Sequence, residues 1–189
     1  MNPRNVLILP GWQGSGPDHW QSRWERLYGY TRVEQHDWMR PLRGDWIARL
    51  EEVVLGCDIE RDGPAVLVAH SLGCPHVAAW AAHSKNTHRV RAALLVAPPD
   101  VERNDLRTML PSWSPIALGR LPFAARMLVS SNDPYCGAAR SRQLAEAWGA
   151  ERVDVGAHGH LNADSSLGDW PEGHAALLAL LRQTPAQPS

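Results

Sequence analysis

One serine stands where it could act as a nucleophile. Ser71 follows the apolar run VLVAH and precedes Leu72, Gly73 and an alanine-rich segment. A strand that turns sharply into a helix lifts a serine hydroxyl above the edge of a parallel sheet, where the hydroxyl can attack a carbonyl group. Gly73 leaves room for this turn, and the backbone N–H of Leu72 can stabilise a negatively charged oxygen. The motif predicts a nucleophile, and the alternative is that Ser71 only caps a helix.

A serine hydroxyl is a weak nucleophile, so it needs a base and a carboxylate that orients the base. Asp133 lies in the segment SSNDP directly after an apolar run, and His160 lies in the glycine-rich loop GAHGHLN. The order serine, acid, histidine along the chain is the one found in hydrolases that place these groups at strand ends. We therefore predict a catalytic triad of Ser71, Asp133 and His160. His158 is the alternative base.

The loop PGWQGSG follows the first apolar run and is expected at the same edge of the sheet. Gly11 opens the turn, and the N–H of Trp12 is predicted to join that of Leu72 in an oxyanion hole. The alternative is a loop that binds a dinucleotide, which requires a helix to begin there and a Tyr-x-x-x-Lys pair. Pro17 delays the helix, and the sole lysine, Lys85, has an alanine four residues before it.

Ligand sites are usually lined by apolar and aromatic side chains with a few polar groups. We predict that Gly11, Trp12, His70 and Trp113 bind the substrate, because each lies in or beside a loop at the active edge. The tryptophans on helical faces are expected in the core: Trp24, Trp46, Trp80 and Trp148. Six further histidines are expected on the surface or on helix faces: His19, His36, His76, His83, His88 and His174.

The elements that position these residues alternate along the chain. Strands are predicted at 5–9, 31–35, 65–69, 92–97, 124–129 and 152–155, and helices at 19–28, 45–55, 72–83, 138–148 and 172–182. This alternation predicts an α/β fold, a three-layer α/β/α sandwich with a mostly parallel, roughly six-stranded sheet. Residues 1–183 are expected to form a single domain, with a flexible tail at 184–189. Residues 98–122 form an irregular excursion from the edge where ligands bind.

Composition narrows the classes of function. The chain has 189 residues, is 44% hydrophobic and 21% charged, and carries a net charge of −1, which argues against nucleic-acid binding. Three cysteines argue against a disulfide framework, and no apolar run is long enough for a membrane span, so a cytoplasmic protein is expected. His158, His160 and Asp164 could suggest a metal site, but a catalytic histidine explains His160 without one. We expect no metal and no cofactor.

These residues resemble the α/β-hydrolases over nearly the whole chain. The narrower likeness is to the small single-domain serine hydrolases similar to retinoblastoma-binding protein 9. The likeness covers residues 6–181 and rests on an early Pro-Gly-Trp, the His-Ser-x-Gly elbow, the Asp-Pro segment, the late Gly-His-x-Asn loop and the helix start Asp45-Trp46. It implies an abbreviated sheet with little or no lid. Two features depart from the pattern: Ala69 replaces the first elbow glycine, and the Leu-x-Cys-x-Glu motif is incomplete at Leu55, so no retinoblastoma-type partner is supported.

The chemistry expected of this site is hydrolysis of a small acyl ester, or of a related thioester or amide, through an acyl-enzyme. The partner is then a small-molecule acyl substrate. The alternative is a non-catalytic binding protein on a hydrolase scaffold, since a fold does not fix a function.

Overall fold

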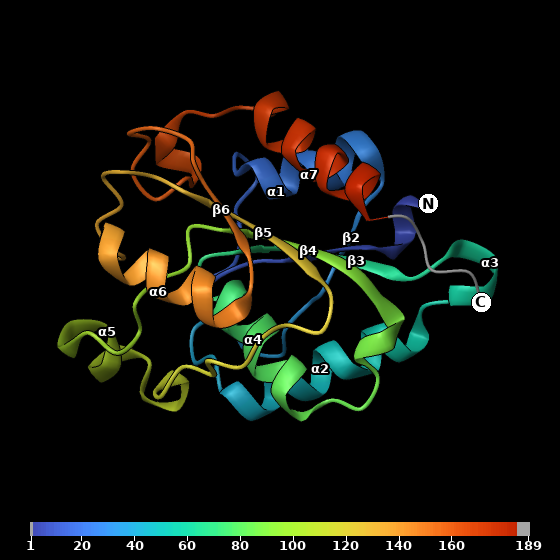
Figure 1. Cartoon of the computed structure of the whole chain (residues 1–189), viewed down its shortest axis with the longest axis horizontal. Helices are drawn as coiled ribbons and strands as arrows, with labels where there is room; N and C mark the ends of the chain where they lie inside the picture. Colours follow the sequence, from blue (N-terminus) through green and yellow to red (C-terminus); the bar gives the residue numbers. More distant parts are fainter. Residues whose placement is uncertain (1, 185–189) are drawn as a thin grey trace.

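The computed structural model describes residues 2–184, in which a six-stranded sheet forms the centre (Figure 1). Every pair of neighbouring strands is parallel, and their order across the sheet is β2-β1-β3-β4-β5-β6. The strands are β1 (Val6–Leu9), β2 (Thr31–Arg32), β3 (Ala65–His70), β4 (Val90–Val96), β5 (Ala124–Val129) and β6 (Glu151–Asp154). The predicted α/β sandwich is confirmed, although the second strand is shorter than expected. Of the predicted tail, all but Thr184 lies outside the described residues.

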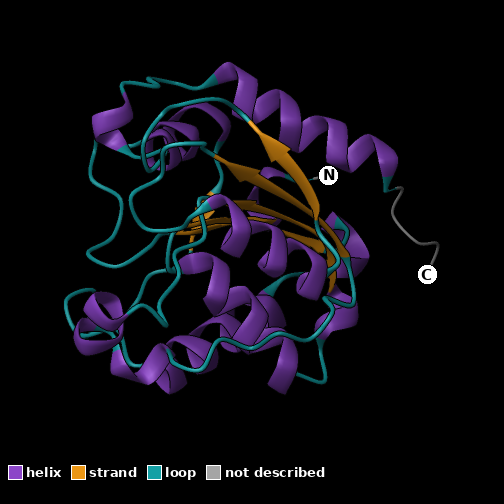
Figure 2. Ribbon diagram, turned by 60° about the vertical axis from the view of Figure 1, so that its left-hand side comes forward, coloured by secondary structure: helices purple, strands orange, loops and turns teal. Residues whose placement is uncertain are grey.

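Helices cover both faces of the sheet (Figure 2). Alternate residues of a strand point to opposite faces, so Val6 and Ile8 belong to the core cluster that includes residues of α1 and α7, whereas Leu7 and Leu9 belong to the cluster that includes residues of α2, α4 and α6. The helices are α1 (Trp20–Tyr28), α2 (Arg43–Gly56), α3 (Ile59–Asp62), α4 (Gly73–His83), α5 (Asn104–Met109), α6 (Ala138–Trp148) and α7 (Pro171–Gln183). No helix among residues 2–184 combines the length and the apolar character needed to cross a membrane.

The excursion between β4 and β5 is less irregular than its composition suggests. It contains α5 and a 3₁₀ turn at Pro111–Trp113, and neither was predicted. The excursion is held at its start by the N–H of Asp100, which donates to the carbonyl oxygen of Tyr135 at 2.9 Å. Arg140 of α6 adds ion pairs with Asp100 and Glu102. The excursion is therefore fastened to the segment that follows β5.

Because all six strands are parallel, their carboxyl ends lie along one edge of the sheet. Ser71 follows β3 directly, Asp133 lies four residues beyond β5, and His160 lies in the loop beyond β6. The loop that begins at Gly11 leaves β1 at the same edge. The topology thus brings together residues that are up to 149 positions apart in the sequence (from Gly11 to His160).

Candidate active site

Ser71 occupies a strained turn between β3 and α4. Its φ angle is 53°, in the left-handed region that residues with a side chain rarely adopt. The strain is held because the N–H of Ser71 donates to the carbonyl oxygen of Val96 at 2.9 Å, which continues the pairing of β3 with β4. Gly73 begins α4 against the end of β1, and a Cβ atom there would overlap the carbonyl oxygen of Leu9. The glycine is therefore required by the neighbouring strand.

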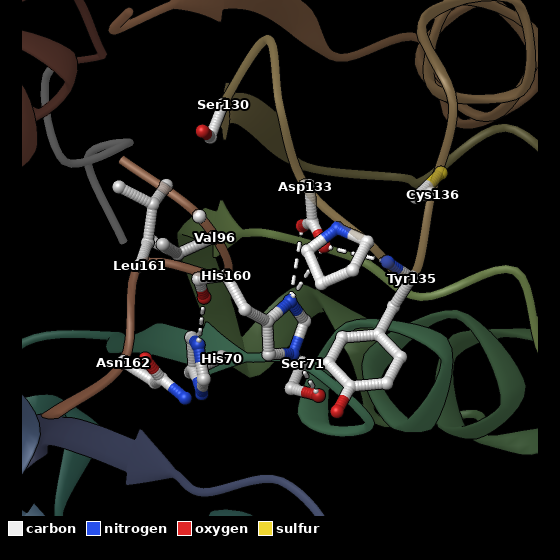
Figure 3. Close-up of polar contacts among 12 residues, drawn as sticks. His70, Ser71, Val96, Ser130, Asp133, Tyr135, Cys136, His160, Leu161 and Asn162 are labelled. Atoms are coloured by element: carbon white, nitrogen blue, oxygen red, sulfur yellow. Dashed lines mark hydrogen bonds and ion pairs between the residues drawn. The ribbon is translucent and has the colours of Figure 1, made fainter. Parts of the chain in front are cut away.

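The side chains of Asp133, His160 and Ser71 form one continuous chain of hydrogen bonds (Figure 3). The Nδ1–H of His160 donates to both carboxylate oxygens of Asp133 at 3.0 Å. The Nε2 atom of the same ring lies 2.8 Å from the hydroxyl oxygen of Ser71 and can accept its proton. Asp133 also accepts the N–H of Tyr135, and its side chain is only 3% exposed. The three predicted residues are thus in the geometry that removes a proton from a serine.

The loops that carry Asp133 and His160 are tied to each other. The Oδ1 atom of Asn132 accepts the hydroxyl hydrogen of Ser130 at 2.8 Å and the N–H of Gly159 at 2.7 Å. The hydroxyl oxygen of Ser130 in turn accepts the N–H of His158 at 2.9 Å. His158 contributes its backbone to this link and is not in contact with Ser71, so the alternative base is not supported.

The loop after β1 lies directly against the elbow. A Cβ atom on Gly11 would lie 2.7 Å from the Cβ of Ser71 and 3.2 Å from the nitrogen of Leu72. The backbone N–H groups of Trp12 and Leu72 donate to no acceptor within residues 2–184. The indole N–H of Trp12 donates to the carbonyl oxygen of Met39 at 3.0 Å, which fixes the loop in place. The N–H groups of Trp12 and Leu72 are therefore two unpaired backbone donors beside Ser71, which lies just before α4.

A cavity of about 530 Å³ opens over Ser71. Apolar side chains line one part of it, and four of them, Pro99, Leu106, Met109 and Leu110, come from the excursion. No aspartate, glutamate, lysine or arginine lines the cavity within residues 2–184. Besides Ser71, Tyr135 and His160, its polar side chains are Gln13, Asn162 and two histidines whose pKa is lowered by burial, His19 and His70. The described part of the cavity wall therefore offers a ligand no carboxylate, ammonium or guanidinium group.

Of the four predicted substrate-binding residues, Gly11, Trp12 and His70 line this cavity. Trp113 does not, and its prediction is wrong. It is 1% exposed, its indole N–H donates to the carbonyl oxygen of Pro41 at 2.7 Å, and its ring packs edge-on against Trp46. The excursion folds back over the beginning of α2, so the tryptophan anchors the excursion from the core side.

His70 has a role in addition to lining the cavity. Its Nε2–H donates to the backbone carbonyl oxygen of His160 at 2.9 Å. Burial, together with the neighbouring His19 and His160, holds the pKa of His70 well below its usual range, so the ring is neutral. His70 therefore fixes the main chain of the base from the end of β3.

His19 and His76 were expected on the surface or on helix faces; His76 lies on α4, and both side chains are buried. His76 lies between α2 and α4, where its Nε2–H donates to the carbonyl oxygen of Trp46 at 2.7 Å. His19 caps α1 and lines the cavity. In the sequence, its place between the glycine-rich loop and Trp20 could indicate a residue that caps the following helix. Nothing in the sequence shows that this residue and Ser71 line the same cavity.

Comparisons with known proteins match the fold over most of the chain. A search among curated proteins finds no match. Among solved structures, a YdeN-like hydrolase from Pectobacterium atrosepticum is 26% identical, with a TM-score of 0.80 over 95% of this chain and 92% of that one. The ydeN gene product of B. subtilis is 20% identical, with a TM-score of 0.72 over 93% and 97%. An esterase domain from Rhodothermus marinus, 15% identical, shares the fold with a TM-score of 0.61 over 93% and 85%.

The sequence pattern of one family matches nearly all of the sheet and its helices. That match extends over residues 6–179, from the first residue of β1 into α7, and so includes every residue of the hydrogen-bonded chain at Ser71. The chain belongs to the serine hydrolase family.

Proposed function

We propose that this protein hydrolyses small, uncharged acyl esters through a covalent intermediate on Ser71. One observation carries the proposal: an unbroken chain of hydrogen bonds runs from Asp133 through His160 to the Ser71 hydroxyl, at a cavity whose described wall has no aspartate, glutamate, lysine or arginine. A serine that only capped a helix would not need a histidine at its hydroxyl or a buried carboxylate behind that histidine.

In the proposed mechanism, His160 Nε2 takes the hydroxyl proton of Ser71 while the serine oxygen bonds to the carbonyl carbon of the ester. Asp133 keeps the proton of His160 on Nδ1 and stabilises the ring when it becomes charged. The N–H groups of Trp12 and Leu72 donate to the oxyanion of the tetrahedral intermediate. His160 then protonates the departing alcohol. A water molecule, activated by the same ring, releases the acid and restores the serine.

Esters are favoured by the character of the cavity. The wall formed by Leu106, Met109 and Leu110 suits an apolar acyl or alcohol group. A charged peptide terminus or a phosphorylated carrier would meet no opposite charge among the residues that line the cavity. We therefore place thioesters and amides below esters as substrates.

The test is the intact mass of the protein after incubation with a fluorophosphonate, which reacts only with an activated serine. We expect one adduct on the wild-type protein and none on Ser71→Ala. The variant should also lose ester hydrolysis by a factor of about 10⁴ or more while retaining its melting temperature. Folded wild-type protein that forms no adduct would instead indicate a binding protein on a hydrolase scaffold, and hydrolysis that survives in Ser71→Ala would exclude this serine.

A further inference from the structure

Two side chains hold the main chain at and directly after His160. The Nε2–H of His70 donates to the carbonyl oxygen of His160 at 2.9 Å (Figure 3). The indole N–H of Trp20 donates to the next carbonyl oxygen along the chain, that of Leu161, at 2.8 Å. His70 ends β3 and Trp20 begins α1, so the two donors come from different elements. The loop after β6 is therefore fixed at two consecutive residues.

Leu161 needs such a contact because its backbone is strained. Its φ angle is 50°, in the left-handed region that a leucine rarely adopts, and the residue is fully buried. A conformation of this kind persists only where the surrounding structure holds it. The N–H of Leu161 donates to the carbonyl oxygen of His158 at 3.3 Å, which is longer than the bond from Trp20. Loss of the Trp20 bond would let the chain relax at Leu161, and His160, the residue before it, would move as well.

The surroundings of Trp20 make it a rigid donor. Trp20 is 1% exposed, and its ring packs edge to face against Trp24 and Trp170, with ring centres 4.6 Å and 5.1 Å apart. The ring cannot turn without displacing these neighbours, so the direction of its N–H is fixed. Trp20 does not line the cavity over Ser71. Any effect it has on a reaction there must pass through the loop that carries His160.

The bond from Trp20 also links two segments of the site. Trp20 begins α1, and α1 follows the loop that starts at Gly11 and carries the Trp12 N–H. That loop lies against Ser71, whereas Leu161 belongs to the loop after β6. The indole N–H therefore connects the segment with the proposed oxyanion donor to the segment with the proposed base.

We infer that Trp20 is a positioning residue, whose indole N–H keeps His160 aligned with Ser71 through the carbonyl group of Leu161. This inference rests on the proposed function. In the structure, Nε2 of His160 lies 2.8 Å from the hydroxyl oxygen of Ser71. Without the Trp20 N–H, this separation is no longer fixed, and the transfer of the hydroxyl proton slows. Binding of the substrate is unchanged, because the cavity wall stays as it is.

Trp24 offers a matched control in the same helix. Its indole N–H donates to the carbonyl oxygen of Asp169 at 2.7 Å, and the residue is 0% exposed. Trp20 and Trp24 thus form the same kind of bond from the same buried cluster. Asp169 is nine positions beyond His160, whereas Leu161 is adjacent to it. A change that only weakens packing should affect both variants alike, so a difference between them reports on the alignment of His160.

The experiment compares Trp20→Phe with Trp24→Phe, because phenylalanine keeps an aromatic ring but has no N–H. The measured quantities are kcat and KM for ester hydrolysis and the rate of reaction with a fluorophosphonate. We expect Trp20→Phe to lower kcat and the fluorophosphonate rate by about 10- to 100-fold, with KM within about 2-fold of wild type. Trp24→Phe should keep both rates within about 3-fold of wild type, while urea unfolding shows a similar loss of stability in the two variants.

Two results would overturn the inference: equal kcat in the two variants, or a rise in KM at unchanged kcat in Trp20→Phe. If Trp20→Phe does not fold, 3-benzothienylalanine in place of Trp20 decides, since sulfur replaces the N–H and the shape of the ring is kept. A lower kcat then supports the inference, and a wild-type kcat overturns it; the same replacement of Trp24 is the control. Failure of the proposed function is distinguishable, because the wild-type protein would then show neither fluorophosphonate adduct nor turnover.

Discussion

The strained backbone of Ser71 depends on neighbours that lack a side chain. A left-handed conformation costs a residue such as serine about 1 to 3 kcal/mol, which the surrounding structure has to hold. Gly11 and Gly73 allow the end of β1 to approach the elbow closely enough to do so, because a Cβ on either glycine would collide with the opposite segment. The position of the serine hydroxyl is therefore set by backbone packing on two strands.

Gly11→Ala should disrupt the site. Its new Cβ would lie 2.7 Å from the Cβ of Ser71, so the loop that carries the Trp12 N–H must move away from the elbow. We expect kcat/KM to fall by about 100-fold or more, as for loss of an oxyanion donor, with a loss of stability of about 1 to 3 kcal/mol. Ester hydrolysis and urea unfolding measure the two effects.

The matched control is Gly44→Ala in the first turn of α2, where nothing lies within 4 Å of the added Cβ. This variant should keep its activity and gain up to about 1 kcal/mol of stability, because alanine favours a helix. Equal activity in the Gly11 and Gly44 variants would contradict the proposed role of the loop.

At the level of single residues, the sequence was sufficient where proximity in space follows from position after a strand. Ser71, Asp133 and His160 each follow a strand, and the structure brings them together as predicted. Trp113 and His19 depend on long-range packing. Trp113 was placed in the site because it lies in a loop, but the loop folds inward onto Pro41. His19 was placed on the surface or on a helix face, although it is buried at the start of α1 and lines the cavity.

The loops that carry Asp133 and His160 form one unit because side chains link them. Asn132 accepts hydrogen bonds from Ser130 and from the backbone of Gly159, and so links the loop after β5 to the loop after β6. This link fixes the distance between Asp133 and His160. The sequence signalled the turn at Asn132 and Asp133 but not this link. The same holds for the excursion, where α5 was missed because six residues are too few for a periodic pattern.

Asn132→Ala should separate the two loops without unfolding the protein. The N–H of Gly159 and the hydroxyl of Ser130 would lose their acceptor, and His160 would shift relative to Asp133. We expect kcat to fall by about 10- to 100-fold with little change in KM, since the change affects alignment and not the cavity wall. Ser131→Ala, at an exposed neighbouring position whose hydroxyl forms no hydrogen bond among the described residues, should behave as wild type. A rise in KM at constant kcat would exclude a positioning role for Asn132.

On the scale of the molecule, the parallel sheet explains why the site could be located from the sequence. Parallel strands share one carboxyl edge, so residues that follow different strands must meet there. The fold class was predictable from the alternation of strands and helices, and the family was predictable from the motifs around Ser71, Asp133 and His160. The narrower likeness to retinoblastoma-binding protein 9 stays a prediction.

Three buried histidines should make the whole molecule sensitive to acid. Burial lowers the pKa of His19 to about 3 and that of His76 to about 4, and it lowers the pKa of His70 as well. In the unfolded chain each titrates near 6.5, so below that pH the unfolded state binds more protons and the stability falls as the pH decreases toward 4. His19 and His76 should each contribute a loss of roughly 2 kcal/mol between pH 7 and pH 5.

Urea unfolding at pH 7 and at pH 5 measures this loss. His76→Leu should be less stable at pH 7, because the carbonyl of Trp46 loses its donor, but its stability should depend less on pH. His88→Asn should show the same pH dependence as wild type. Equal stability of the wild-type protein at both pH values would show that these rings are not held neutral.

The components of the site are divided between two stretches of the chain. Residues 11–72 carry Ser71 and the proposed oxyanion donors, residues 130–160 carry Asp133 and His160, and the exposed residues 118–120 lie between them. A chain cut at Gly119 would yield two fragments, neither of which holds a complete site. The two fragments would meet where β4 pairs with β5. Turnover would then require the fragments to reassemble, which gives this 189-residue protein the layout of a split reporter for protein–protein association.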